Sequence, residues 1–536
     1  MNERQKHDSF ILSGSVFLIT SDGKTLNLPV PSSNPCDPLN WGWQKRAFTL
    51  VPISIYAISA IIVTQGEIVI MRGLKNEFPE DKRAPFTMED MITAPTLFMG
   101  IGALFWIPLT TALGRRPPFI MASLLLLLAC LVAGTSTNFR VLIACISVIG
   151  FCTGFSLSAI YLIVIDITFI HQRPRAIAMV WAFIGGVALN LLGSVPFLTD
   201  HGNQWRNLFL YWSIPIGISC LLAIICFPET YFKRPTVAYD GLTILQSASE
   251  KLIIYEDDLS DPNWSLYNKD LPAPPTRNCF QKFVDQYCFR ITRASWKTFI
   301  YCFPQMFFCA LNPLIFWVLI LTATNFAGMM FIGATYGIVL TSDPYNLPSR
   351  LLVLVSTSCG FGTFLAWPLG GCLVCLWIKK LAKRNKGVRE AEHYLVAYIL
   401  PVLTGAASTI IYGCAVEFNW HYTMYYLAYG LNGFSFVTLG MTNTLWVTEA
   451  FPRWAAPALA VVSGGSYITS FAMSYALNVW IPRHGYLKVG IELTVLQIVT
   501  GLIIWPIFAK GKGVRQRING RWGKWAEGRE GALRPL

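Results

Sequence analysis

Long apolar segments separated by short polar ones dominate the chain. Residues 118–135, 208–227 and 394–416 each run for about 20 residues without a single Asp, Glu, Lys or Arg. That length crosses the ~30 Å hydrocarbon core of a bilayer. Because a backbone in lipid must satisfy its hydrogen bonds within its own segment, these segments are predicted to be transmembrane helices.

The same pattern predicts twelve spans, six on each side of a long polar stretch. The predicted spans are residues 47–70, 92–113, 118–135, 139–165, 176–198, 208–227, 313–340, 351–378, 394–416, 422–447, 457–479 and 486–509. The fold class is therefore an all-α membrane protein whose twelve transmembrane helices form two pseudo-symmetric six-helix bundles. The predicted domains are an N-terminal segment (1–46), a first bundle (47–227), a central loop (228–312), a second bundle (313–509) and a basic tail (510–536).

Composition and charge agree with this interpretation and exclude others. Of the 536 residues, 54% are hydrophobic and 13% are charged, whereas soluble domains carry about 25% charged residues. The net charge of +13 does not indicate nucleic-acid binding, because 33 of the 42 Lys and Arg residues fall in loops on one predicted side. Basic loops stay in the cytosol, so both termini and the central loop are predicted to be cytosolic.

The two predicted bundles repeat each other. Basic loops follow the second span of each half, at Arg115-Arg116 and at residues 379–384. Arg residues beside Pro follow the fourth span of each half. The fifth spans carry the Gly pairs Gly185-Gly186 and Gly464-Gly465, which predict close helix contacts. Two similar bundles suit a transporter that opens a central site alternately to each side.

Several motifs resemble a known family. Residues 106–118 resemble the loop signature between spans two and three of the major facilitator superfamily. Residues 37–41, 169–173, 205–206, 228–235 and 384–393 resemble its fungal twelve-span drug:proton antiporter-like group. The resemblance implies the major facilitator fold and proton-coupled efflux from a fungal cell across the plasma membrane. The chain departs from the signature at Thr111, where the family has Asp, and lacks the mid-span Arg of the fourth helix.

Candidate binding residues are the polar side chains inside predicted spans. Glu67 is the candidate carboxylate for a proton or cation, because burial disfavours its ionised form. Alternatively, the first span ends near Gly66 and Glu67 is solvated. The resemblance implies that spans one, four, seven and ten line the cavity. The remaining substrate-binding candidates are Tyr56, Tyr161, Asn190, Asn325, Asn432 and Tyr467.

Charged residues at the cytosolic ends of spans are candidates for a gate. Asp166 and Glu449 end spans four and ten, each shortly before an Arg. They are predicted to form ion pairs that hold the inner side closed, although unpaired boundary charges would give the same pattern. The other predicted members of this gate are Arg115, Arg116, Arg173, Arg175 and Arg453.

The sequence contains no pattern typical of an enzyme. The six His residues have no metal-ligand spacing and no Gly-rich phosphate loop is present, so we expect no cofactor, no metal and no ATP hydrolysis. Aromatic residues make up 14% of the chain, which favours an apolar binding site for bulky amphipathic molecules.

Three functions remain open at this point. The first is export of a hydrophobic or amphipathic small molecule in exchange for protons. The second is proton-coupled import of a nutrient or an organic cation such as a polyamine. The third is a sensor with a transporter fold. The expected partners are the small molecule, protons and the lipid bilayer, with the chain acting as a monomer.

Overall fold

The computed structural model describes residues 16–17, 37–200, 202–232, 244–246, 252–254, 295–385, 388–451 and 454–526. The elements of the first half are β1 (Val16–Phe17), η1 (Pro38–Asn40), α2 (Trp43–Gln65), α3 (Glu67–Glu77), α4 (Glu80–Arg83), α5 (Asp90–Leu113), α6 (Arg116–Thr135), α7 (Phe139–Ser156), α8 (Ala159–Asp166), α9 (Arg173–Leu192), α10 (Val195–Leu198) and α11 (Arg206–Ile225). The central loop contributes β2 (Ile244–Gln246), β3 (Leu252–Ile254) and α14 (Trp296–Leu311).

The second half begins with a long helix that starts directly after Asn312. Its elements are α15 (Pro313–Thr341), α16 (Ser349–Leu365), the π-helix η4 (Ala366–Cys372), α17 (Leu373–Arg384), β4 (Val388–Arg389), the 3₁₀ helix η5 (Ala391–Tyr398), α18 (Ile399–Glu417), α19 (Thr423–Ala450), α20 (Ala455–Leu502) and α21 (Ile504–Ala526). The short strands pair as β1 with β4 and as β2 with β3, both antiparallel.

Local sequence explains where many of these helices begin. The side chains of Asn138 and Asn312 accept hydrogen bonds from the first turns of α7 and α15. Proline lies in the first turn of α6, α9 and α15, where its missing N–H group costs no helical hydrogen bond.

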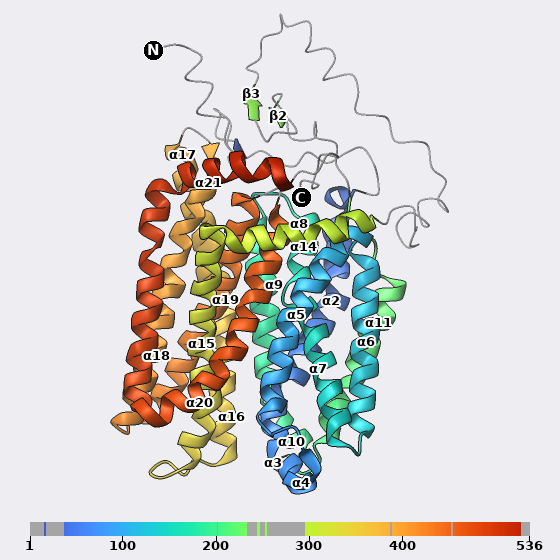
Figure 1. Cartoon of the computed structure of the whole chain (residues 1–536), viewed down its shortest axis with the longest axis vertical. Helices are drawn as coiled ribbons and strands as arrows, with labels where there is room; N and C mark the ends of the chain where they lie inside the picture. The colour runs from blue at the N-terminus through green and yellow to red at the C-terminus, as the bar shows by residue number, and fades with distance from the viewer. Residues whose placement is uncertain are drawn as a thin grey trace, which may run out of the picture.

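Two helical bundles lie side by side in the structure (Figure 1), which confirms the predicted fold class. Within the described residues, length and composition single out ten segments able to cross a membrane. Ten segments are consistent with twelve spans. The 28-residue helix α19 is not among the ten and would be the eleventh. Helix α20 is counted once but consists of two helices that meet at Gly485, where φ is 77°.

Several predicted spans are interrupted rather than straight. The fourth span breaks at Leu157 and Ser158, between α7 and α8. The eighth span passes through η4 before it continues as α17. The first span extends beyond its predicted end at residue 70, because α3 continues to Glu77. The last span bends near Ile503, and α21 covers much of the predicted tail.

Helices α14 and α21 lie across one end of the two bundles (Figure 1). Ser295, just before α14, donates a backbone hydrogen bond to Ala112, close in sequence to Arg115, and Lys512 of α21 donates to Glu390. We call this end of the molecule, with the loops that carry Arg115, Arg173 and Lys379, the basic face.

Helix α14 packs against α5 of the first half and α20 of the second. Residues 279–308 are rich in aromatic and basic side chains, a composition typical of an interfacial helix, and α14 covers the last part of this stretch. Residues 279–294 lie outside the described part of the chain. Helix α21 lies over the second half, near η5.

The halves meet along two long helix contacts, α5 with α20 and α9 with α16. The predicted close approach at the Gly pairs is confirmed. A Cβ atom on Gly464 would lie 2.9 Å from the carbonyl oxygen of Gly100, and one on Gly186 would lie 2.8 Å from the ring of Phe364. Backbone contact of this kind fixes which helices of the two halves can pair.

Candidate transport site

A cavity of about 70 Å³ lies between the two halves. Helices from both bundles contribute to its wall, among them the broken fourth span. The lining residues are Ile61, Thr64, Gln65, Met99, Thr153, Leu157, Tyr161, Trp181, Ile184, Gly185, Leu189, Phe326, Met329, Thr363, Gly433, Phe436, Val437 and Tyr467. The volume is large enough for only a few water molecules.

Aromatic rings form much of the cavity wall. Tyr161 stacks on Trp181 with ring centroids 4.5 Å apart and an interplanar angle of 6°. Phe326 packs against both Phe436 and Tyr467, each at 5.5 Å between centroids. Every described residue that lines the cavity is uncharged. Such a wall favours apolar and aromatic ligands with few hydrogen-bonding groups.

Polar groups line one side of the cavity at the first span. The hydroxyl groups of Thr64 and Thr153 lie 2.8 Å apart and link the first span to the fourth. Thr153 lies one turn before the break between α7 and α8. The backbone at this break is not helical. Irregular backbone is tolerated inside a membrane protein where it lines a cavity, as it does here.

Two of the predicted substrate-binding residues, Tyr161 and Tyr467, line the cavity. Of four others, Tyr56, Asn325 and Asn432 pack within one half, and Asn190 lies where the two halves meet. Tyr56 donates a hydrogen bond to the carbonyl of Cys152 (2.7 Å). Asn325 donates to Ser435 (2.6 Å) and Asn432 donates to Ser408 (3.1 Å). Asn190 donates to the carbonyl of Gly186 (2.7 Å) beside the α9–α16 contact. Their part in substrate binding stays a prediction.

Glu67 is buried inside the first bundle. Only 1% of its surface is exposed, so the alternative that it is a solvated residue at the end of the span is wrong. Neither carboxylate oxygen has a hydrogen-bond partner among the described residues. Glu67 is not among the residues that line the cavity and lies near Cys130 of α6.

The sequence did not single out Trp181, Phe326 or Phe436 as cavity residues. Phe326 follows the candidate Asn325, and Phe436 lies one helical turn after the candidate Asn432. For α15 and α19 the helix was therefore expected to line the cavity, but its rotation was not predicted. Only packing between helices sets that rotation, because both helices are apolar around most of their circumference. Trp181 lies on α9, outside the four spans expected to form the lining.

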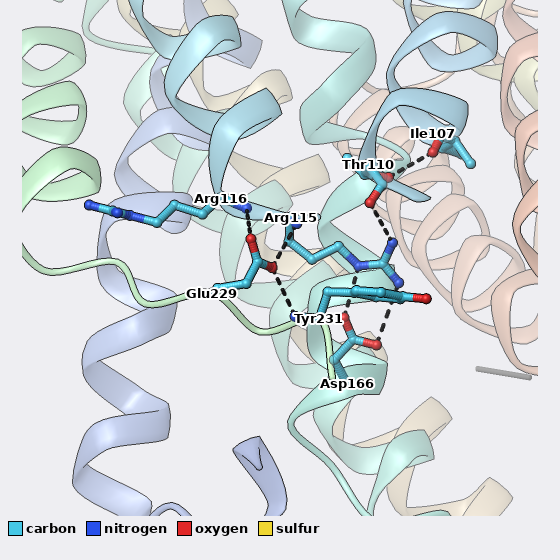
Figure 2. Close-up of polar contacts among 7 residues, drawn as sticks. All are labelled: Ile107, Thr110, Arg115, Arg116, Asp166, Glu229 and Tyr231. Carbon is cyan, nitrogen blue, oxygen red and sulfur yellow. Dashed lines mark hydrogen bonds and ion pairs between the residues drawn. The ribbon is translucent and has the colours of Figure 1, made fainter. Parts of the chain in front are cut away.

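A compact ionic cluster lies on the basic face of the first half (Figure 2). The buried guanidinium of Arg115 donates to Asp166 at 2.8 Å and to the carbonyl of Thr110 at 3.1 Å. It also lies over the ring of Tyr231, 5.0 Å from the centroid. Burial alone would lower the pKa of Arg115, but Asp166 and the other acidic groups nearby raise it, so its charge is permanent.

Glu229 joins the same cluster through the backbone. Its carboxylate accepts hydrogen bonds from the N–H groups of Arg115 (2.8 Å), Arg116 (3.2 Å) and Tyr231 (2.9 Å) (Figure 2). Burial raises the pKa of Glu229 above its usual value, although these donors favour the ionised form. Residues 228–235 were recognised only by their resemblance to a family motif, which did not predict this role for Glu229.

A second ion pair joins the two halves. Arg173, at the start of α9, donates to Glu449, near the end of α19, at 3.1 Å. A smaller cavity of about 30 Å³ leads from Trp181 and Phe436 toward Asn443 and Thr444 of α19. Glu449 lies five residues beyond Thr444 on α19, toward the end of that helix.

The remaining predicted gate residues lie nearby or outside the described residues. Arg116 donates to the carbonyl of Ile224 at 2.5 Å. Arg175 interacts with Cys375 of α17. Arg453 lies outside the described part of the chain. Two side-chain pairs considered from the sequence, Arg115 with Asp166 and Arg173 with Glu449, are present, and their role in gating stays a prediction.

Two helical bundles around a shared central cavity, joined by an ion pair on one face, define a membrane transporter of the secondary type. The chain belongs to the Major Facilitator Superfamily, whose family model matches residues 53–474. The recognition made from the sequence motifs is confirmed at this level.

Known proteins of the same family resemble the chain over most of its length. An uncharacterised MFS-type transporter of Schizosaccharomyces pombe is 23% identical over 93% of this chain and 89% of its own length. The efflux pump radE of Floropilus chiversii is 22% identical over 80% of this chain and 73% of its own. The solved structure of the proton:xylose symporter XylE bound to 6-bromo-6-deoxy-D-glucose is also similar, with a TM-score of 0.54. The match covers 86% of this chain and 96% of the XylE chain. The sequences are 11% identical, so this similarity shows the fold alone.

Proposed function

We propose that the protein exports a hydrophobic or amphipathic small molecule by alternating access, in exchange for protons. The observation that carries this proposal is the wall of the central cavity. It is aromatic, contains a few hydroxyl and amide groups, and is uncharged at every described position. A bulky apolar molecule gains from leaving water for such a wall, and a strongly hydrated sugar or ion does not.

Two further observations support the proposed direction of transport and its coupling to protons. The similarity to the efflux pump radE favours export. Glu67 is the proposed proton carrier, because an ionised carboxylate without a partner is costly in a buried site. Protonation of Glu67 would change the charge of the first span, which also carries Thr64 and Gln65 in the cavity wall.

The proposed orientation places the basic face in the cytosol. The loops on this face carry most Lys and Arg residues, as the positive-inside rule requires. The Arg173–Glu449 ion pair then acts as an inner gate that holds the halves together while the site is closed toward the cytosol. The proposed location is the plasma membrane of a fungal cell.

Import of an organic cation is the second candidate. A polyamine carries several charges and would need carboxylates in the cavity wall to replace its water. Glu67 is the candidate carboxylate, and it is buried outside the lining. A sensor without transport is the third candidate, and it rests on the departures at Thr111 and in the fourth span.

Transport into and out of proteoliposomes separates the three candidates. We expect vesicles with an acidic exterior to expel a preloaded hydrophobic fluorescent dye, because protons enter in exchange. Import would instead accumulate external spermidine under the same gradient, and a sensor would bind dye without flux. Either of these results would contradict the proposal.

A matched pair of variants tests whether the aromatic wall binds the dye. Trp181→Ala removes the ring that stacks on Tyr161 in the cavity wall. It should raise the KM for dye about tenfold, since an aromatic contact between the dye and this ring would contribute up to about 1.5 kcal/mol beyond its area. Phe183→Ala is the control, because Phe183 lies on the same helix and is half exposed on its outer side. Equal KM values for both variants would contradict the assignment of the site.

A further inference from the structure

A second cavity, of about 310 Å³, lies away from the central site. Helices α17, α18 and α19 enclose it together with η4 and η5. We call it the lateral crevice, and it is lined by Leu369, Gly370, Leu373, Val374, Trp377, Ile378, His393, Val396, Ala397, Ile399, Leu400, Leu403, Thr438 and Met441. Apart from His393 and Thr438, every lining residue is apolar or Gly.

The crevice opens sideways, toward the surroundings of the bundle. Leu373, Trp377 and Leu403 form its rim and are 42%, 53% and 58% exposed. Its floor is formed by Gly370 against α19, where a Cβ atom would lie 2.7 Å from Thr438. These helices span the membrane, so the rim faces lipid chains rather than water.

Basic side chains continue the same face of α17 beyond the crevice. Lys380 lies seven residues after Leu373, and Arg384 lies seven residues after Trp377. Seven residues are two helical turns, so both cations lie above the rim at about 10 Å along the helix axis. Both are exposed. Lys379 lies on a different face, close enough to Cys375 for an electrostatic interaction.

We propose that the lateral crevice binds an anionic phospholipid of the leaflet on the basic face. One acyl chain fills the apolar crevice, and the phosphate lies between Lys380 and Arg384. An apolar slot beneath two cations at this spacing matches a lipid with a negative headgroup. A neutral sterol would leave the cations unused, and a soluble anion would leave the slot empty.

The bound lipid would brace the part of the second half that packs against α9. Gly371, next to the crevice floor, packs against Ala178 of α9, and α9 begins with Arg173. The chain in the crevice would hold η4 against α9. Lipid binding is therefore expected to favour the state in which Arg173 and Glu449 are joined.

Photocrosslinking in nanodiscs tests the site directly. The full chain is reconstituted with phosphatidylserine or phosphatidylcholine that carries a diazirine near the end of one acyl chain, and adducts are mapped by peptide mass spectrometry. We expect the phosphatidylserine probe to label residues 369–378 and 396–403. Phosphatidylcholine should label them several-fold less. Equal labelling by both lipids, or competition by a sterol alone, would overturn the proposal.

Charge variants provide the matched comparison. Lys380→Gln with Arg384→Gln should weaken labelling by at least about fivefold, since one cation near an anionic surface changes affinity by about that factor. Lys379→Gln removes the same charge from another face and should leave labelling unchanged. Phosphatidylserine should also raise the Tm of the unmodified chain but not of the double variant. Equal labelling of the three proteins would contradict the site even if all of them fold.

Discussion

Glu67 combines two properties that rarely occur together in a membrane protein. It is 1% exposed, and neither carboxylate oxygen has a hydrogen-bond partner among the described residues. A charged side chain at the centre of a bilayer costs about 2.5–3.5 kcal/mol on insertion scales. A residue that only stabilised the fold would be replaced by Leu or Gln at lower cost, which favours a role in proton binding.

Replacement of Glu67 by Gln tests that role. The amide keeps the shape of the side chain but cannot exchange a proton, so dye export should no longer depend on pH. The measurement is the initial rate in proteoliposomes between pH 5.5 and 8. Glu492→Gln is the control, because Glu492 pairs with His484 in an exposed position. A pH profile identical to that of the unmodified chain would remove Glu67 from the mechanism.

Individual site residues were only partly predictable from the sequence. Tyr161 and Tyr467 were predicted and line the cavity, whereas Tyr56 has a similar apolar setting and packs against Phe119 and Phe155. The difference depends on helix rotation, which a sequence with apolar residues on all sides does not encode locally. Asp166 and Glu449 could be selected, because charges at the ends of spans are scarce.

Helix contacts between the halves depend on glycine. Gly464 and Gly100 approach so closely that an added Cβ atom on either would lie within 3 Å of the other backbone. Gly464→Leu should therefore lower the free energy of unfolding by about 1–3 kcal/mol, as overpacking does elsewhere. The measurement is unfolding by SDS in mixed micelles. Gly337→Ala, which meets nothing within 4 Å, should not be destabilising; equal losses would contradict the assignment.

Helix α21 is attached to the start of the 3₁₀ helix η5 by two ion pairs. Lys512 donates to Glu390 at 2.8 Å, and Arg515, only 2% exposed, lies 2.9 Å from Glu392. Burial would raise the pKa of Glu390, but Lys512 outweighs it and the pKa lies below the usual value of 4.5. A carboxylate with a lowered pKa stabilises the folded state above pH 4.5. This contribution is lost as the pH falls through the pKa of Glu390 in the folded protein.

Acid should therefore loosen α21. A nitroxide at position 510 is expected to become more mobile below pH 4.5, as measured by electron paramagnetic resonance. The change should be small, because the pair is partly exposed and such pairs contribute up to about 1 kcal/mol. Glu390→Gln should give the mobile spectrum at neutral pH as well. A spectrum independent of pH in the unmodified chain would contradict this role.

Interruptions of the helices were harder to predict than the helices. The apolar runs gave the positions of the spans within a few residues in most cases. The break at Leu157 and Ser158 and the π-helix η4 were not predicted. Neither Pro nor Gly lies at the break itself, whereas η4 contains Pro368, Gly370 and Gly371, a signal for irregular helix that the prediction of a straight span left out. Helix α21 was missed because its polar sequence resembles a solvated tail.

The arrangement of two bundles could be derived from hydropathy and the repeated loops alone. Which helices of the two halves touch could not, because that choice is made by contacts between residues hundreds of positions apart. Arg173 and Glu449 are such a pair, separated by 276 residues. Breaking a buried pair typically costs about 3–5 kcal/mol, enough to shift a two-state equilibrium between conformations substantially.

Distances between spin labels on both faces measure the motion that this account requires. On a background without other cysteines, one pair combines Cys226 with Lys383→Cys on the basic face, and the other combines Asn138→Cys with Thr423→Cys on the opposite face. We predict that Glu449→Gln adds a longer distance to the first pair and a shorter one to the second. Unchanged distances, or changes of the same sign on both faces, would contradict alternating access by these two halves.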